Sequence, residues 1–353
     1  MKLFRLFLLI FLTMSLFSSC TEDLGYVNIS GYAQGGTYLV TANITKDVEL
    51  DPEQIKVGID EIILNIDNTL SGYNKGSMLS KFNAGETIVP NEMFVDIYQR
   101  SREFWRLTDG AVDVAAGPLF DAWGFGFKSG DMPTASQVSD LLDGSGMDRL
   151  VEQMSEAVSG DGSLCGADLL MDENSGGALP LLNYNAVAQG YSCDLVAAYL
   201  YSLGIKDMLV NIGGEIFVDG LNPRGSNWTL GIDRPEDGNM VPGQSVELTF
   251  KTKGGPCGIV TSGNYRKFYI KDGKKYAHTV DPRTGYPVDH HLLCATIISP
   301  DATSADAYAT HCMVVGLEKA KEFILNAEDL EGYLIYEENG KMMTWSSREM
   351  PGL

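Results

Sequence analysis

The sequence is short of positive charge. Lysine and arginine together number 26, against 47 aspartate and glutamate residues, and the formal net charge at pH 7 is -21. A chain this acidic is poorly suited to bind nucleic acid or an anionic membrane surface, because these carry charge of the same sign. Solubility accounts for the excess of acidic residues. Hydrophobic residues make up 44% of the 353 positions, enough to form a substantial core in one large domain or two small ones.

Cysteine pairs with the spacing of metal or redox sites are also missing. The sequence has six cysteines, and those beyond Cys20 are scattered with no CxxC spacing. This excludes zinc-ribbon and thioredoxin-like sites. We expect buried free thiols, with one disulfide left open, at the five later positions, which are Cys165, Cys193, Cys257, Cys294 and Cys312.

Four common catalytic and nucleotide-binding motifs are absent as well. The sequence has no GxxxxGK[ST], no GxGxxG after a predicted strand, no GxSxG and no HExxH. These absences argue against P-loop, Rossmann, α/β-hydrolase and zincin enzymes. The chemistry must therefore be sought in dispersed segments.

The chain begins with a short apolar run, residues 6–12, which follows the basic residues Lys2 and Arg5. The run is too short for a permanent membrane-spanning helix, and its basic flank is typical of an export signal. Small residues stand directly before Cys20, which favours a bacterial lipoprotein signal over an ordinary cleaved signal with an incidental cysteine.

This interpretation gives the domain organisation. We expect residues 1–19 to be a lipoprotein signal peptide, Cys20 to be lipidated, residues 20–25 to be a linker and residues 26–353 to form a single catalytic domain. The mature protein is then an exported, membrane-anchored lipoprotein that faces the periplasm.

Hydrophobic periodicity predicts several helices. After Asp51 and Pro52, isoleucines recur at helical spacing as far as Leu70. Further helices are predicted over residues 91–107, 134–152, 191–203 and 318–325, and in a segment through Asp306.

Strand and turn signals lie between these helices. Residues 26–44 are rich in β-formers and broken by Gly35 and Gly36, which predicts a hairpin, and residues 158–177 read as a loop or hairpin crossing. Helices and strands do not alternate strictly, so the fold class is α+β with mixed, largely antiparallel sheets and packed helices. The other predicted strands cover residues 208–212, 228–232, 245–251, 265–270 and 293–299.

Asp306 and Thr310 are one helical turn apart, so their side-chain oxygens can face the same point. A carboxylate and a hydroxyl at one point suit a small hard cation, and Mg²⁺ commonly accompanies phosphates. The alternative is structural: with Thr303 or Ser304 as the helix cap, Asp306 would lie in the favourable first turn. The pair thus predicts either a metal site for phosphoryl chemistry or a capped helix start.

The block His278-Thr279-Val280-Asp281-Pro282-Arg283-Thr284-Gly285 offers a second group of polar side chains beside a turn. His278 can be a general acid or base, or a buried histidine bonded at a strand end. Arg283 could contact a phosphate with both arms of its guanidinium. His290, His291 and His311 lack comparable surroundings and are taken as structural or surface residues.

Two small-residue segments could admit a ligand to the main chain. Residues 110–113 and 117–119 join a helix end to a loop, where small side chains permit close approach, although a plain C-cap and turn explain them equally. Residues 183–190 form a polar loop before a helix N-terminus, a place suited to an anion, with ordinary capping as the alternative.

Taken in order, these segments resemble the ApbE-like FAD:protein FMN transferases. Each match is weak alone, but the ordered series covers most of the chain after the signal. The matching segments include Gly35-Gly36-Thr37-Tyr38, Leu70-Ser71-Gly72-Tyr73, Gly110-Ala111-Val112-Asp113, Ala188-Gln189-Gly190-Tyr191, Asn211-Ile212-Gly213-Gly214-Glu215, the His278–Gly285 block and Ala305-Asp306-Ala307.

The resemblance implies an ApbE-like fold and a Mg²⁺-dependent enzyme that cleaves the FAD pyrophosphate. FMN passes to a threonine or serine hydroxyl of an acceptor protein, and AMP is released. Acceptors by analogy are flavoprotein subunits of membrane electron-transfer complexes, such as the Na⁺-pumping NADH:quinone reductase and its relatives.

The resemblance also assigns roles by position. It places the metal on Asp306, Thr310 and the carbonyl of Ala186, and gives His278 the activation of the acceptor hydroxyl. The predicted FAD contacts are Gln34, Tyr73, Ala111, Val112, Asp113, Asn183, Gln189 and Val280.

Three of these residues depart from the family pattern. Gln34 stands where many members have Met, Asn183 where Asp or Glu is frequent, and Gln189 where Lys is frequent. These changes could favour hydrolysis of FAD to FMN and AMP. Two alternatives to the transferase therefore stay open, a metal-dependent FAD pyrophosphatase and a non-catalytic FAD-binding lipoprotein.

Overall fold

An eight-stranded sheet runs through the protein, in the order β1-β2-β5-β6-β9-β14-β15-β16, and every neighbouring pair is antiparallel. The structure is a computed structural model that describes residues 25–44, 51–127, 132–150, 164–165, 181–236, 239, 243–265, 268–271 and 274–347. The strands of this sheet are β1 Tyr26–Ala33, β2 Gly36–Asn43, β5 Met208–Ile212, β6 Glu215–Asp219, β9 Cys257–Gly263, β14 Leu292–Ser299, β15 Glu331–Glu338 and β16 Lys341–Ser346.

The hairpin β1–β2 turns at Gln34 and Gly35, whose φ angles are 50° and 78°. Two successive positive φ values form the turn type that matches the right-handed twist of the flanking strands. Gly35 adopts this conformation at no steric cost, whereas Gln34 is an unusual residue there. The predicted hairpin is confirmed.

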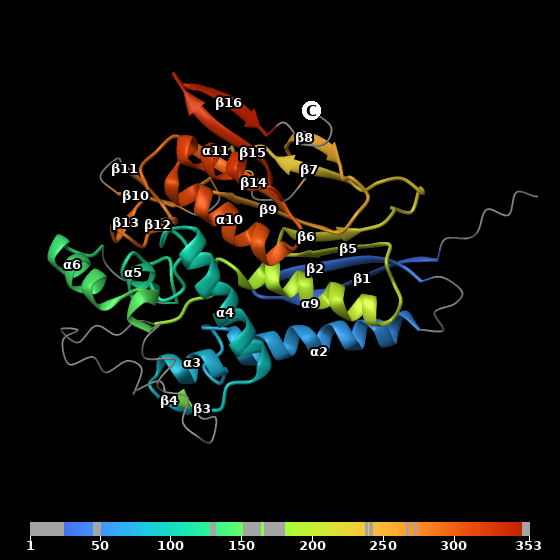
Figure 1. The fold of residues 1–353 in the computed structure, drawn as a ribbon, viewed down its shortest axis with the longest axis horizontal. Coiled ribbons are helices and arrows are strands. Elements are labelled where there is room, and N and C mark those ends of the chain that lie inside the picture. Colours follow the sequence, from blue (N-terminus) through green and yellow to red (C-terminus); the bar gives the residue numbers. More distant parts are fainter. Residues whose placement is uncertain are drawn as a thin grey trace, which may run out of the picture.

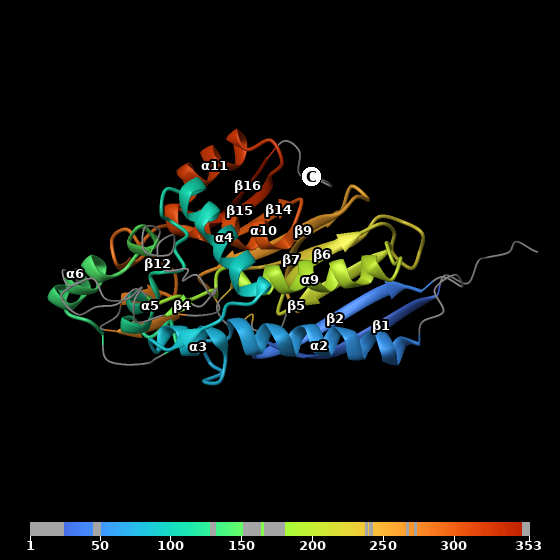
Figure 2. The ribbon, with the colours of Figure 1, turned by 60° about the horizontal axis from the view of Figure 1, so that its bottom comes forward.

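Helices cover one face of the sheet (Figures 1 and 2). The helix α9 packs on β5 and β6, α10 packs on β9 and β14, and the two helices also contact each other. The helix α2 packs against β1 and α9. The bounds of the larger helices are α2 Pro52–Leu70, α4 Glu92–Leu107, α9 Ala188–Ser202, α10 Ala302–Val315 and α11 Leu317–Asn326.

Alternating residues of the sheet serve two separate cores. In β15, Leu334 belongs to the core under α10 and α11, whereas Tyr333 and Ile335 face the opposite side. There they pack with the two-stranded sheet of β7 Thr229–Asp233 and β8 Val246–Lys251. Because successive side chains of a strand point to opposite faces, the sheet carries a packed apolar layer on each face.

A small apolar cluster holds the far end of the molecule together, at the left of Figure 1. Its centre is formed by Ala116, Leu119, Trp123, Val138 and Val280. The elements in and around this cluster are α5 Gly117–Ala122, α6 Ala135–Gly144, β10 Phe268–Lys271, β11 Lys274–Ala277, β12 Val280–Asp281 and β13 Tyr286–Pro287. Three smaller elements lie nearer α2, namely α3 Met78–Asn83 and the paired strands β3 Thr87–Ile88 and β4 Leu164–Cys165.

The α+β class with largely antiparallel sheets is confirmed, with two corrections to single elements. The predicted continuous helix over residues 134–152 is interrupted: α6 ends at Gly144, Gly146 has a φ of 120° that a helix cannot contain, and residues 147–150 are helical again. Helix α9 starts at Ala188, three residues before its predicted start. The predicted signal peptide, Cys20 and most of residues 158–177 lie outside the described residues.

Two further properties bear on the sequence predictions. Four cysteines are free thiols, and three of them, Cys193, Cys294 and Cys312, are buried, as predicted. Among the described residues, no helix combines the length and hydrophobicity needed to cross a lipid bilayer.

Candidate functional site

Two helices distant in sequence face each other at the centre of the candidate site. At one turn of the interface, Asp194 of α9 accepts hydrogen bonds from the backbone N–H groups of Ala302 and Thr303 at the start of α10, at 2.8 and 2.9 Å. One turn further, the N–H of Gly190 in α9 donates to Asp306 Oδ2 at 3.1 Å. The helices therefore run antiparallel, with steps of four residues on each side.

The two other predicted metal ligands, Ala186 and Thr310, follow one step further along the chain on either side. Ala186 precedes Gly190 by four residues, and Thr310 follows Asp306 by one turn on the same helix face. Both are partly exposed, and no described residue donates a hydrogen bond to the carbonyl oxygen of Ala186. The donor set is a carboxylate, a hydroxyl and a free carbonyl, all hard oxygen ligands of the kind that Mg²⁺ prefers. The residues fit the predicted metal.

Asp306 lies in surroundings that favour a bound cation. Its side chain is 5% exposed. Burial raises the pKa of its carboxyl well above the ordinary value, and the carboxylates of Glu215 and Asp194 raise it further, whereas the N–H of Gly190 lowers it. A positive ion beside this carboxylate would offset both the burial and the two acidic neighbours.

The cap of α10 corrects one prediction. Neither Thr303 nor Ser304 caps the helix; the N-cap is Asp301, whose Oδ1 accepts the N–H of Ser304 at 2.8 Å. Asp306 lies more than a turn beyond this cap and bonds to another helix. The structural alternative for Asp306, a first-turn residue next to its own cap, is therefore wrong.

The β1–β2 turn reaches over the start of α9. The side-chain amide of Gln34 donates to the carbonyl of Ala188 at 3.3 Å and also to the hydroxyl of Ser192. The Gln189 amide nitrogen occupies the space that a Cβ at Gly213 would need, and the φ of 71° at Gly213 also favours glycine. The predicted contacts Gln34 and Gln189 thus lie together around the first turn of α9, next to the Asp306 carboxylate.

Backbone pairing connects a second group of predicted residues to the segment that leads into α9. The N–H of Asn183 donates to the carbonyl of Val114 at 2.7 Å, and Ala116 forms an isolated bridge with Leu181. This pairing places residues 111–116 beside the strand-like segment that leads to Ala186. The side chain of Asn183 is buried and accepts the N–H of Asn185 at 3.0 Å.

Asp113 is buried in that segment and is bonded to the protein itself. Its two carboxylate oxygens accept the N–H groups of Ala115, at 2.8 Å, and Met147, at 3.0 Å. Burial raises the pKa of Asp113 to about 6, although the two N–H groups lower it and Asp148 adds to the rise. Through these bonds the side chain of Asp113 holds the loop in its conformation. Ala111 and Val112, which precede it, are also buried.

The block from His278 to Gly285 docks on the small apolar cluster. Trp123 Nε1 donates to the carbonyl of Gly285 at 2.7 Å, and Val280 is buried in the cluster. His278 follows β11 and is partly exposed, with its ring 6.3 Å from that of Phe125 in an edge-to-face arrangement. The histidine therefore has access to solvent on the side of the molecule that carries residues 110–125.

Arg283 does not extend toward a ligand. Its Nε and Nη2 donate to the two oxygens of Asp281 at 2.8 Å each, and its stem lies over Gly110. The bidentate partner predicted to be a phosphate is the carboxylate two residues earlier. The guanidinium thus stiffens the turn, and a phosphate contact at Arg283 stays a prediction.

The remaining predicted contact, Tyr73, is 66% exposed and packs edge-to-face on Phe127 with ring centroids 5.0 Å apart. The Phe127 N–H donates to Asp121 at 2.6 Å, which links Tyr73 to the loop after α5. Tyr73 therefore borders the same end of the molecule as His278 and Phe125.

The other histidines have structural surroundings. His290 Nε2 shares a hydrogen bond of 2.8 Å with the carbonyl of Met313. Burial lowers the pKa of His311 to about 4, with Arg283 and Lys319 acting in the same direction, and its ring packs 4.3 Å from that of Phe323. Among the described residues, no group of three His, Cys, Asp or Glu side chains could hold a metal ion, so the candidate site depends on mixed oxygen donors.

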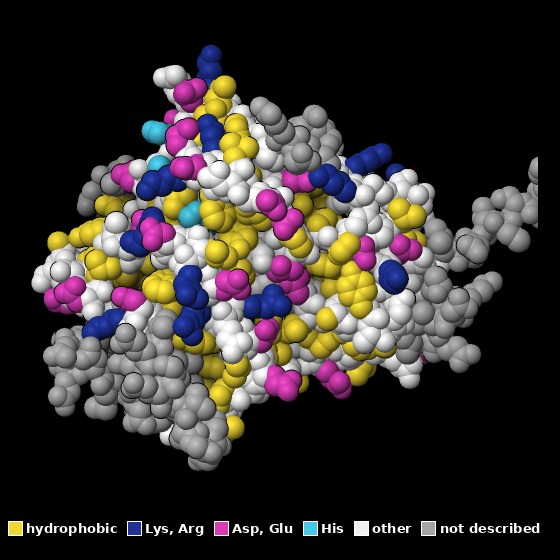
Figure 3. Space-filling view, viewed as in Figure 1, with side chains coloured by type: hydrophobic (Ala, Val, Ile, Leu, Met, Phe, Trp, Pro, Cys, Tyr) yellow, Lys and Arg dark blue, Asp and Glu magenta, His cyan; other side chains and the backbone are white. Residues whose placement is uncertain are grey.

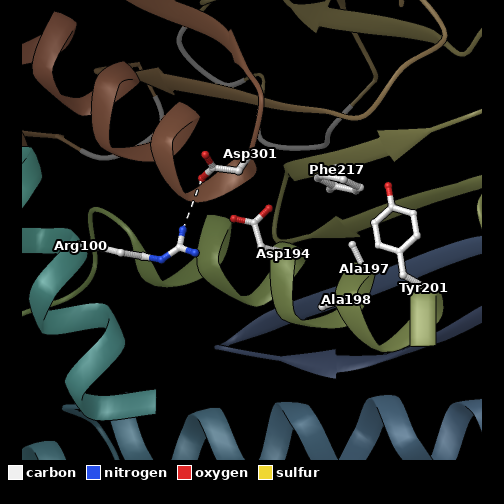
Figure 4. Close-up of a pocket in the computed structure, with 7 residues that line it drawn as sticks. All are labelled: Arg100, Asp194, Ala197, Ala198, Tyr201, Phe217 and Asp301. Atoms are coloured by element: carbon white, nitrogen blue, oxygen red, sulfur yellow. Dashed lines mark ion pairs between the residues drawn. The ribbon is translucent and has the colours of Figure 1, made fainter. Parts of the chain in front are cut away.

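One cavity adjoins the candidate site at Asp194. It has a volume of about 220 Å³ and lies further along the same face of α9, between Arg100, Asp194 and Tyr201 (Figure 4). Another, of about 400 Å³, lies between the segments 252–257 and 328–331. On the face in Figure 3, acidic and basic side chains of the described residues are interspersed, so this face presents no extended patch of one sign.

Sequence reasoning overlooked two acidic residues at this site. Asp194 bridges α9 and α10, and Glu215, quoted before only as part of a motif, raises the pKa of Asp306. A charged residue within the apolar run of α9 was the available signal for Asp194, since such residues are seldom placed there without partners.

Comparison with known proteins places this architecture in a family. Residues 35–334 match the model of the ApbE family. The FAD:protein FMN transferase of Escherichia coli K12 is 34% identical over 287 residues, covering 80% of this chain and 76% of that protein, and the one from Haemophilus influenzae is 29% identical over 338 residues, covering 94% and 92%.

Solved structures agree with this placement. The flavin transferase ApbE from Vibrio cholerae superposes with a TM-score of 0.75 at 28% identity, covering 92% of this chain and 97% of that one. The apo flavinyl transferase ApbE from Pseudomonas stutzeri gives a TM-score of 0.77 at 28% identity, covering 93% and 97%. The chain is a member of the ApbE family.

Proposed function

We propose that the protein is a Mg²⁺-dependent FAD:protein FMN transferase, which moves FMN from FAD to a threonine or serine hydroxyl of an acceptor protein and releases AMP. The observation that carries the proposal is the pairing of α9 and α10, which sets the buried carboxylate of Asp306 against the N–H of Gly190. Family membership and the relatives named FAD:protein FMN transferase support it.

The chain's own part in metal binding would be to supply three oxygen ligands, from Asp306, Thr310 and the carbonyl of Ala186. When bound there, Mg²⁺ would offset the negative charge of the FAD pyrophosphate, which otherwise repels a nucleophile. The burial of Asp306 supports this role, because a buried carboxylate with one N–H partner gains most from a cation.

The remaining predicted residues would bind and orient FAD. The side chains of Gln34 and Gln189 lie at the start of α9, while Tyr73 and Val280 belong to the far end of the molecule. Ala111, Val112 and Asn183 would complete the FAD contacts. Asp113 would act through the loop that it shapes. Gln34 and Gln189 are uncharged, so most of the attraction for the pyrophosphate would come from elsewhere in the site.

His278 would be the general base. Its imidazole would take the proton from the acceptor hydroxyl as that oxygen attacks the phosphorus of the FMN half. A bond forms between this oxygen and phosphorus, the pyrophosphate bond breaks, and AMP leaves with the bridging oxygen. Its partly exposed position supports this role, since a base for a protein substrate must be reachable from outside.

We also propose where the protein works. Its N-terminal sequence supports an exported lipoprotein held at the membrane through Cys20 and facing the periplasm. Acceptors there would be flavoprotein subunits of membrane electron-transfer complexes.

The test uses purified protein with FAD, Mg²⁺ and an acceptor fragment that carries the family's Ser/Thr-Gly-Ala-Thr-type motif. We expect covalent flavin fluorescence on the acceptor in a denaturing gel and AMP release in equal amount. AMP release without labelling would indicate a pyrophosphatase instead. Tight FAD binding with neither product would indicate a storage protein.

Two variants separate the roles within that assay. We expect Asp306→Ala to abolish Mg²⁺-dependent turnover, and His278→Ala to retain FAD binding but lose at least about 100-fold of the transfer rate. His290→Ala is the matched control for histidine loss, because His290 bonds to Met313 away from the site. Normal transfer by His278→Ala would show that another group is the base.

A further inference from the structure

Asp194 connects the two helices that carry the candidate metal ligands. It lies on α9 and reaches the first turn of α10, where its carboxylate accepts the N–H of Ala302 at 2.8 Å and the N–H of Thr303 at 2.9 Å. The hydroxyl of Thr303 donates to the same carboxylate. These residues are 108 and 109 positions apart in sequence, so the bonds join separate elements.

The chemistry of these bonds makes them a strong link. The first N–H groups of a helix have no partner within the helix, and their dipoles favour a negative charge. Hydrogen bonds to an ionised carboxylate are about twice as strong as bonds between neutral groups. Asp194 uses both oxygens in this way, and it therefore fixes both the distance and the register between α9 and α10.

The register between α9 and α10 matters because it sets the relative positions of the proposed metal ligands. Thr303 lies three residues before Asp306 on α10, and Asp194 lies four residues after Gly190 on α9. A shift of α10 along α9 would carry Asp306 away from the N–H of Gly190 and Thr310 away from Ala186. Figure 4 shows the side chain of Asp194 on α9, facing the pocket that it lines together with Asp301 at the start of α10.

The neighbouring carboxylate, Asp301, has a different task. It caps its own helix by accepting the N–H and hydroxyl of Ser304, both at 2.8 Å, and Arg100 approaches it at 3.7 Å from α4. Asp301 therefore stabilises the end of α10 without joining it to α9. The two aspartates line the same cavity, but only Asp194 forms hydrogen bonds between α9 and α10.

We propose that Asp194 is a positioning residue of the metal site, which holds α10 in register on α9 so that Asp306 and Thr310 meet the carbonyl of Ala186. The proposal rests on the proposed function. Asp194 would set the geometry of the metal ligands, whereas Asp301 only stabilises the start of its own helix. Because both aspartates line one pocket, substitutions at the two positions allow these effects to be compared.

The experiment compares Asp194→Asn with Asp301→Asn. Asparagine at 194 presents an NH₂ group to one of the two backbone N–H groups, so one bridging bond is lost. Asparagine at 301 caps a helix about as well as aspartate. Each variant is measured for the Mg²⁺ concentration that gives half-maximal AMP release from FAD in the presence of the acceptor fragment, and for Mn²⁺ binding without FAD by electron paramagnetic resonance.

We expect Asp194→Asn to raise the half-saturating Mg²⁺ concentration and the Mn²⁺ dissociation constant by about tenfold or more, as is typical when a group that orients metal ligands is lost. Asp301→Asn should change both by less than about twofold. Equal effects of the two variants, or an Asp194→Asn variant with unchanged metal dependence, would overturn the proposal.

A second pair of variants decides the case if Asp194→Asn does not fold. Thr303→Val removes only the hydroxyl that bonds to Asp194, and Thr303→Ser keeps it. We expect Thr303→Val to raise the Mg²⁺ requirement and Thr303→Ser to retain the wild-type value, and equal values for the two would overturn the proposal. If wild-type protein releases no AMP with FAD, Mg²⁺ and the acceptor fragment, the proposed function fails, whereas the Mn²⁺ affinities still test Asp194.

Discussion

Asp113 shows how one buried carboxylate can shape a binding loop at a cost in stability. It is 8% exposed and accepts two backbone N–H groups, from Ala115 and Met147. Burial still dominates and raises the pKa of its carboxyl from 3.8 to about 6. The folded protein therefore holds a proton on Asp113 at pH values where the unfolded chain has released it.

This difference predicts the pH dependence of stability. Because the folded pKa is raised, the stabilising contribution of protonated Asp113 is complete below pH 4 and is lost as the pH rises through about 6. The loss corresponds to about 3 kcal/mol. Urea unfolding of wild type and Asp113→Asn at several pH values measures it: the free energy of unfolding of wild type minus that of the variant should fall by this amount between pH 4 and pH 7.

Asp140→Asn, at an exposed position of α6, controls for the loss of one negative charge from an acidic chain. Parallel curves for wild type and Asp113→Asn would contradict the assignment and would mean that the two N–H bonds fully offset burial.

At the scale of single residues, local spacing predicted part of the site. Asp306 and Thr310 were recognisable because an interval of four residues on a helix fixes a shared face. The bidentate bond of Arg283 to Asp281 was not predicted, although the two residues are only two positions apart. Asp194 was missed because its function depends on which helix start packs beside it, and no local pattern contains that information.

At the scale of elements, the start of α10 packs so closely on β9 and α9 that the residues facing it must be glycine. A Cβ at Gly258 in β9 would overlap the backbone of Ala302, and a Cβ at Gly190 would overlap the carbonyl of the same residue. The start of α10 is therefore pressed between strand β9 and helix α9. These contacts and the Asp194 bonds act on the same turn of α10.

Gly258→Ala should displace the start of α10. We expect a loss of about 1–3 kcal/mol in the free energy of unfolding, the usual cost of overfilling a packed interior. The same displacement should raise the half-saturating Mg²⁺ concentration, because Asp306 lies one turn further along α10. Chemical denaturation and the Mg²⁺ dependence of AMP release measure the two effects.

Gly255→Ala is the matched control, since a Cβ at Gly255 meets no atom within 4 Å. It should leave both quantities unchanged within error. A Gly258→Ala protein that is less stable but has normal Mg²⁺ dependence would show that α10 shifts as a rigid unit with α9.

The elements that sequence predicted well are those with long, regular patterns. Helices α2 and α4 carry apolar residues at helical spacing and have recognisable caps in Asp51 and Asn91. Strands β6, β9, β15 and β16 were not predicted, because their patterns are short and their neighbours in the sheet are far away in sequence. β6, for example, lies between β5 and β9, and the latter begins 38 residues after β6 ends. Such pairing is decided by tertiary packing and not by local preference.

At the scale of the whole molecule, one sheet connects both ends of the described chain. β1 starts at Tyr26, β16 ends at Ser346, and every strand between them is hydrogen-bonded to its neighbours. The candidate site also draws on both halves, since Gln34, Gln189 and Asp306 come from the β1–β2 turn, α9 and α10. Ligand binding should therefore stabilise the entire domain.

This connection predicts a single unfolding transition that responds to FAD and Mg²⁺ together. With both present at about 100 times their dissociation constants, each ligand adds about 2.7 kcal/mol to the free energy of unfolding, because it binds only the folded state. Differential scanning calorimetry should show one peak that moves to higher temperature, and EDTA should reverse the part that Mg²⁺ contributes. Asp306→Ala should keep the shift due to FAD and lose the shift due to Mg²⁺. Two separate peaks, of which only one moves, would instead mean that β1, β2 and α2 unfold independently of the part that holds Asp306.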